Sequence, residues 1–190
     1  MADTGKTSKR RTIMGVTMTS LFAALIAGGA FVSVPLPVSP VPMVLQNLFI
    51  VLAGLALGPA RGSAATALYL LAGALGLPVF AGAAGGIAHF AGPTGGFLIG
   101  YFFAALGAGL IAGRPSAETA FPRIAAASAA GFLIVYVPGV FRLYLLLGNW
   151  PAAFAAGLFP FLIGDAVKAV IAALIAPRMR RIMADHLFDL

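Results

Sequence analysis

The chain has 190 residues, 61% of them apolar and only 9% charged, with a formal net charge of +7 and no cysteine. Soluble domains carry roughly a quarter charged residues, so this composition excludes a soluble enzyme, a disordered protein and a disulfide-rich secreted scaffold. The basic residues lie in short clusters between long apolar runs, which argues against a nucleic-acid-binding face. We therefore expect an all-α, polytopic integral membrane protein.

Six apolar runs, separated by polar or Pro- and Gly-rich breaks, predict six membrane-spanning helices. The first begins at Thr12 and is as long as a full span, so we interpret it as a retained helix and not as a cleaved signal. The runs cover residues 12–33, 44–59, 62–77, 94–113, 123–147 and 153–177. They predict a basic cytoplasmic segment, a single transmembrane domain and a cytoplasmic tail, over residues 1–11, 12–177 and 178–190.

Two long, uncharged connectors interrupt these runs. Residues 34–42 contain four prolines, which forbid a helix and favour an extended segment. Residues 78–96 are rich in glycine and alanine. If the spans alternate, both connectors lie on the outer face, where they would suit lids over a site that opens outward. The alternative is that they are ordinary surface loops.

Lysine and arginine are unevenly distributed between the two sides. With alternating spans, ten of them fall on one side, and the three connectors on the other side contain none. Cytoplasmic loops carry an excess of these residues, so both termini are expected in the cytoplasm. The ten are Lys6, Lys9, Arg10, Arg11, Arg61, Arg114, Arg123, Arg178, Arg180 and Arg181.

Three charged residues lie within the predicted spans, namely Arg142, Asp165 and Lys168. Charged side chains inside a membrane usually face the interior of the bundle and serve a function. Asp165 and Lys168 are three positions apart and therefore share one face of a helix. They predict a polar binding site, and the alternative is an ion pair that only stabilises helix packing.

The three charges sum to +1, which a small monocarboxylate would neutralise. Lys168 or Arg142 would then contact its oxygens, and Asp165 would accept hydrogen bonds from its N–H groups. In straight antiparallel helices, the spacing from the outer turn at Asn149 places Arg142 and Asp165 roughly 13 Å apart in depth. Arg142 therefore either reaches the outer surface or binds a second end of an elongated ligand.

Catalytic and cofactor motifs are missing from the sequence. The two histidines, His89 and His186, are far apart and predict no metal site. No Gly-x-x-x-x-Gly-Lys phosphate loop is present, so ATP-driven transport would need another protein to hydrolyse ATP. We expect neither an enzyme nor a bound cofactor or metal.

Three segments together resemble the BioY family, the biotin-binding S components of energy-coupling factor (ECF) vitamin transporters. The first is Pro40-Val-Pro-Met-Val-Leu-Gln46. The second runs from Tyr69 to Gly96 and ends in Gly92-Pro-Thr-Gly-Gly96. The third is Gly164-Asp-Ala-Val-Lys168 on the last predicted span. Their order and spacing extend the resemblance from the first span to the last.

The resemblance implies a six-helix bundle of the S-component type that binds biotin from the outside with high affinity and mediates its uptake. It implies polar contacts from Asp165 and Lys168 to the vitamin. Further binding positions transferred with the motifs are Gln46, Phe80, Gly82 and Thr94. Val44 stands where the family usually has threonine, so a hydroxyl contact is absent there.

Biotin also suits the charged site, because it carries one carboxylate, two ureido N–H groups and an apolar body between them. Either end could meet Asp165 or Lys168, and Arg142 is a second candidate for the carboxylate. Aromatic residues near the outer mouth would pack against the ring system or form an interfacial belt. These are Phe80, Tyr136, Tyr144 and Trp150.

S components that resemble this chain work with a transmembrane T subunit and two ATPase subunits in the bacterial inner (cytoplasmic) membrane, in contact with its lipid. The resemblance implies docking of the T subunit on Ala23-x-x-x-Ala27 of the first span. Three alternatives remain: an S component for another vitamin, a stand-alone proton-coupled carrier of small carboxylates in which Asp165 titrates, and an integral membrane enzyme.

Overall fold

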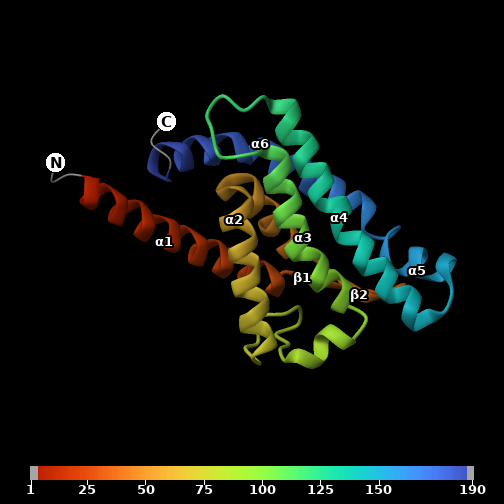
Figure 1. The fold of residues 1–190 in the computed structure, drawn as a ribbon. Helices are drawn as coiled ribbons and strands as arrows, with labels where there is room; N and C mark the ends of the chain where they lie inside the picture. The colour runs from red at the N-terminus through yellow and green to blue at the C-terminus, as the bar shows by residue number, and fades with distance from the viewer. Residues whose placement is uncertain (1–3, 188–190) are drawn as a thin grey trace.

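A computed structural model describes residues 4–187 of the chain, with side chains described from residue 9 to residue 185. Figure 1 shows a bundle of helices with a small two-stranded sheet beside it. The elements are α1 (Thr4–Phe31), β1 (Ser33–Leu36), β2 (Ser39–Val44), α2 (Gln46–Ala74), the 3-10 helix η1 (Ile87–Ala91), α3 (Gly95–Ala112), α4 (Phe121–Leu147), α5 (Trp150–Gly157) and α6 (Leu162–Leu187).

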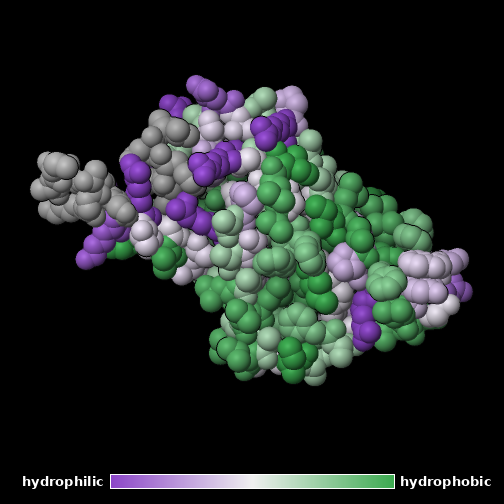
Figure 2. All heavy atoms as spheres, in the orientation of Figure 1, coloured by the Kyte–Doolittle hydropathy of each residue, from purple (hydrophilic) through white to green (hydrophobic). Residues whose placement is uncertain are grey.

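Four of the described helices are long and apolar enough to cross a membrane, and the bent pair α5–α6 makes a fifth candidate. Figure 2 shows a broad apolar surface, with hydrophilic residues gathered mainly at the end that holds the connection between α3 and α4. The prediction of a mostly helical, multi-pass membrane protein is confirmed.

Helix α2 reverses its direction at Gly58. This residue has φ +79° and ψ 179°, which side-chain-bearing residues rarely adopt, and Pro59 next to it has no N–H to continue the helix. A Cβ atom on Gly62 would lie 2.6 Å from the Cα of Gly54, so the two halves of α2 lie against each other. The two halves correspond to the runs expected at 44–59 and 62–77. The prediction placed the break between residues 59 and 62, and the structure has it at Gly58.

The proline-rich connector is extended, as predicted, and it also forms an antiparallel hairpin that the sequence analysis did not anticipate. Ser33 pairs with Val44, and Leu36 pairs with Ser39. The fold is therefore not purely helical. Because the proline nitrogens cannot donate hydrogen bonds, a single hairpin at the surface is a place where this composition is tolerated.

The last predicted span, 153–177, is bent and consists of two helices. Helices α5 and α6 meet at an angle of 49°, and Pro160 lies in the break between them. Helix α6 continues past Pro177 to Leu187, so the predicted tail is helical as far as the structure describes it. The basic segment expected at 1–11 is likewise part of α1 from Thr4 onward.

Candidate functional site

A buried ion pair lies near the start of α6. Lys168 Nζ is 2.7 Å from Asp165 Oδ1, and the two residues are only 8% and 6% exposed. They lie one helical turn apart, so their side chains point the same way, as the spacing predicted. Because α6 begins after a break in the chain's helical path, its first turns lie beside β2 and the beginning of α2.

Asn47 of α2 completes the ion pair from across the bundle. Its Nδ2 donates to Asp165 Oδ1 at 3.0 Å, and its Oδ1 accepts from Lys168 Nζ at 2.9 Å. Lys168 Nζ also donates to the backbone oxygen of Val44 at 2.8 Å. An ammonium has three N–H donors, so all the hydrogen-bonding capacity of Lys168 is directed to the protein.

Tyr136 of α4 contacts the free side of the carboxylate. Its hydroxyl donates to Asp165 Oδ2 at 2.6 Å. This residue was predicted as a ring-packing aromatic, and the structure gives it a polar contact as well. We call Asn47, Tyr136, Asp165 and Lys168 the polar cluster. Its charges cancel, and each partner orients the next.

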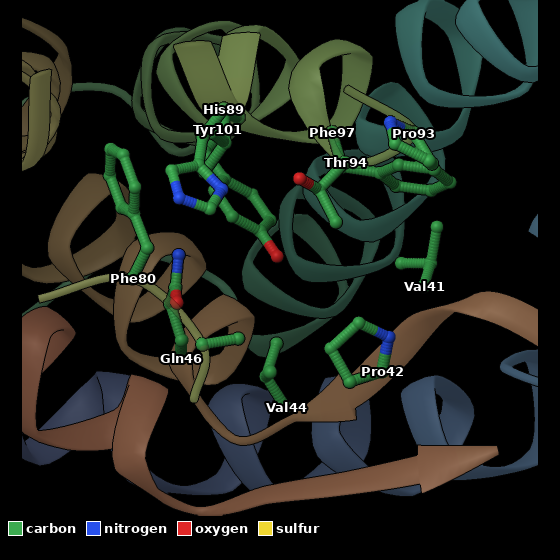
Figure 3. A pocket seen from close by; sticks show the side chains of 12 residues that line it. Val41, Pro42, Val44, Gln46, Phe80, His89, Pro93, Thr94, Phe97 and Tyr101 are labelled. Carbon is green, nitrogen blue, oxygen red and sulfur yellow. The ribbon is translucent and has the colours of Figure 1, made fainter. Parts of the chain in front are cut away.

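A cavity of about 270 Å³ lies between β2, the start of α2, the glycine-rich loop and the first turns of α3 (Figure 3). A narrow extension of about 20 Å³ reaches Asp165 and Lys168. The cavity and the extension share the walls Val41, Pro42, Val44, Phe97 and Tyr101. The cavity beside the glycine-rich loop and the small pocket at the ion pair are therefore adjacent.

Four predicted binding residues can be located relative to this cavity. Gln46, Phe80 and Thr94 line it, whereas Gly82 lines a neighbouring groove of about 540 Å³ between the β1–β2 hairpin and the glycine-rich loop. Gln46 is 2% exposed, and its side chain interacts with the hydroxyl of Tyr69. Gln46 thus brings a polar side chain to the cavity wall, next to Tyr69.

Phe80 anchors the glycine-rich loop to α2. It is 3% exposed, and its ring meets that of Tyr69 edge-on at 5.7 Å. A Cβ atom on Gly73 would clash with the Phe80 ring, so only glycine admits this contact. Further along the loop, His89 and Phe90 also pack edge-on against Phe80.

Arg142 lies apart from the polar cluster and lines neither the cavity nor its extension. It donates from Nε to the backbone oxygen of Gly92 at 3.3 Å and from its terminal nitrogen to that of Ala91. Arg142 thus ties the end of η1 to α4. Arg142 therefore makes its hydrogen bonds with the end of η1 and none with Asp165.

The two alanines expected on the docking surface of α1 both face the core of the bundle. Ala23 is buried at 7% exposure and belongs to the core, and Ala27 is half-buried against it. Ala24 and Gly28, which are also four positions apart, are exposed instead. A Cβ atom on Gly28 would meet nothing within 4 Å.

A second buried cation, Arg180, lies near the other end of α6 and is fully buried. Its guanidinium donates to the backbone oxygens of Leu55, Ala112 and Arg114 at 2.6, 3.0 and 2.7 Å, and to Thr119 Oγ1 at 3.0 Å. From the sequence, Arg180 was expected only as one of the ten basic residues on the cytoplasmic side. In the part of the chain that the structure describes, no group of three histidine, aspartate or glutamate side chains could hold a metal ion.

Comparison with known proteins gives consistent matches. The sequence model of the BioY family matches residues 4–185. The chain is 42% identical over 165 residues to the "Probable biotin transporter BioY" of Pyrococcus horikoshii, covering 87% of this chain and 95% of that protein. It is 41% identical over 166 residues to the "Biotin transporter BioY" of Thermotoga maritima, with the same coverage.

The fold is also similar to a solved structure, the crystal structure of the S-component for biotin from an ECF-type ABC transporter. The two chains superpose with a TM-score of 0.81 at 29% sequence identity. The match covers 89% of this chain and 92% of the other. The similarity therefore includes nearly all of the elements that form the cavity and the polar cluster.

Proposed function

The chain belongs to the BioY family, and we propose that it takes up biotin as the substrate-specific component of a vitamin transporter. The observation that carries this proposal is the buried polar cluster at the inner end of a cavity open to the outer loops. The cavity is close to the lower end of the usual range for small-molecule pockets, about 300–1,000 Å³. It joins apolar walls to a charged end, and biotin has the same combination.

Six membrane crossings follow if the two halves of α2 count separately and α5–α6 counts as one broken span. Their alternation puts both termini in the cytoplasm, on the side of the ten basic residues. The β1–β2 hairpin and the glycine-rich loop then face outward and cover the cavity. Biotin enters from that side and reaches Asp165 last.

A transmembrane T subunit and ATPase subunits supply the energy, in the bacterial inner membrane. The similarity to an S-component of an ECF-type ABC transporter supports these partners, and the chain itself has no phosphate-binding loop. The T subunit docks on α1. Because Ala24 and Gly28 are exposed whereas Ala23 is buried, the close helix contact involves Ala24 and Gly28 together with the half-buried Ala27.

Ligand binding to the purified protein in detergent tests this function. Calorimetric titration of the wild type with biotin is expected to give saturable, high-affinity binding, and thiamine and riboflavin in the same buffer give none. Asp165→Asn is expected to weaken biotin binding, because it removes the charge that orders the polar cluster. A folded wild type that does not bind biotin, or binds the other vitamins equally well, would refute the proposal.

A further inference from the structure

Lys168 and Arg142 both bind other groups of the protein, so neither is available for the negative charge of a ligand. The inference below concerns the residue that binds this charge, and it rests on the proposed function. Biotin carries a carboxylate, which needs N–H donors or a cation when it leaves water. All three N–H groups of Lys168 are directed to the protein. Arg142 donates to two backbone oxygens of the loop and does not line the cavity.

His89 is the one residue on the wall of this cavity whose side chain can carry a positive charge. It belongs to η1, at the outer end of the cavity, whereas the polar cluster lies at the inner end. In Figure 3 its ring lies beside those of Phe80 and Tyr101, at the edge of the empty volume. The Phe80 contact, with centroids 5.8 Å apart, holds one edge of the ring.

The nitrogens of His89 are available to a ligand. Neither ring nitrogen makes a hydrogen bond with the residues that the structure describes, and the side chain is half-buried. A neutral imidazole offers one N–H donor and an imidazolium offers two. Gln46 also lines this cavity, with its amide beside Tyr69.

We propose that His89 donates a ring N–H to the carboxylate of biotin. The vitamin then lies with its carboxylate outward, near η1, and its ureido ring inward, toward Asp165. Between the two ends, Val41, Phe97 and Leu98 supply apolar walls for the valeryl chain and the thioether ring. This orientation leaves the hydrogen bonds of Lys168 intact.

The test compares biotin with its uncharged carboxamide on the wild type and His89→Phe. Phenylalanine keeps a ring against Phe80 and removes both nitrogen donors. For biotin, the dissociation constant is expected to rise about 10- to 100-fold in His89→Phe, as for the loss of a hydrogen bond to a charged group. For the carboxamide, it is expected to stay within about twofold of the wild type.

Two further variants complete the experiment. His89→Gln keeps an N–H donor without a full charge and is expected to bind biotin more tightly than His89→Phe. Ile87→Phe changes an exposed residue of η1, 70% exposed, and is expected to bind both ligands as the wild type does.

The outcomes separate this inference from the proposed function. Equal biotin affinity in the wild type and His89→Phe would overturn the inference while leaving biotin binding established. Equal losses for biotin and the carboxamide would also overturn it, because His89 would then act through loop packing alone. A wild type that binds neither ligand would refute the proposed function itself.

Discussion

The two buried cations of α6 have opposite surroundings. Lys168 is paired with a carboxylate and borders the extension of the cavity, whereas Arg180 donates hydrogen bonds to backbone oxygens and to one hydroxyl. They lie twelve residues apart, which corresponds to roughly 18 Å along the helix. A buried charge beside an empty volume indicates a binding site. A buried charge surrounded by carbonyl groups indicates a structural role, and we call Arg180 with its acceptors Leu55, Ala112, Arg114 and Thr119 the clasp.

A break in α2 explains why Arg180 binds there. In a continuous helix the backbone oxygen of Leu55 would accept from the N–H of residue 59, but that residue is Pro59 and has none. The Arg180 guanidinium donates to this oxygen instead, at 2.6 Å. It also binds Ala112 at the end of α3, where helix carbonyls lack partners. One side chain thereby joins α6 to the break in α2 and to the end of α3.

Loss of the clasp should have the largest effect on stability. Arg180→Leu leaves the buried backbone oxygens of Leu55 and Ala112 without this donor, each worth about 1–3 kcal/mol, so the free energy of unfolding is expected to fall by at least about 2 kcal/mol. Thermal unfolding of the ligand-free protein in detergent measures this. Arg181→Leu, at the exposed neighbouring position, serves as the control, and equal melting temperatures for the two variants would contradict the assignment.

Breaking the ion pair should affect binding most. Lys168→Met leaves the Asp165 carboxylate buried without its cation and is expected to weaken biotin binding roughly 30-fold or more. The double variant Asp165→Asn, Lys168→Met removes both charges. It should unfold at a higher temperature than Lys168→Met alone, because no unpaired charge remains buried. Additive losses in the two single variants would show that the charges are not coupled.

Tyr136→Phe should give the smallest change. It removes one hydrogen bond to Asp165 and keeps the ring, so biotin affinity is expected to fall about threefold to tenfold. Tyr144→Phe is the matched control, because Tyr144 stacks on Trp150 at 4.0 Å and lies outside the cavity walls. A Tyr136→Phe affinity equal to that of the control would remove Tyr136 from the cluster.

The contrast between the two cations also explains what the sequence could predict. The spacing of Asp165 and Lys168 on an apolar helix was sufficient to place them on one buried face. Arg180 gave no such signal, since it stands among other arginines at a predicted cytoplasmic end. Its burial depends on Pro59 leaving an oxygen unpaired in another helix, which is a tertiary contact.

Two other features were missed for similar reasons. Asn47 follows Gln46 at the start of a helix, where a polar residue is ordinary, and only packing brings it to Asp165 across the bundle. The pairing of β1 with β2 depends on where the ends of α1 and α2 bring the proline-rich segment. In contrast, the extended form of that segment followed from its prolines alone.

The most direct test of this account measures biotin affinity for Lys168→Met and Arg180→Lys side by side. Arg180→Lys keeps a buried cation with three donors, so the protein should remain folded. The account predicts that Lys168→Met loses most of its biotin affinity and that folded Arg180→Lys retains wild-type affinity. Wild-type affinity in Lys168→Met, or an equal loss in both folded variants, would contradict the division of α6 into a binding end and a structural end.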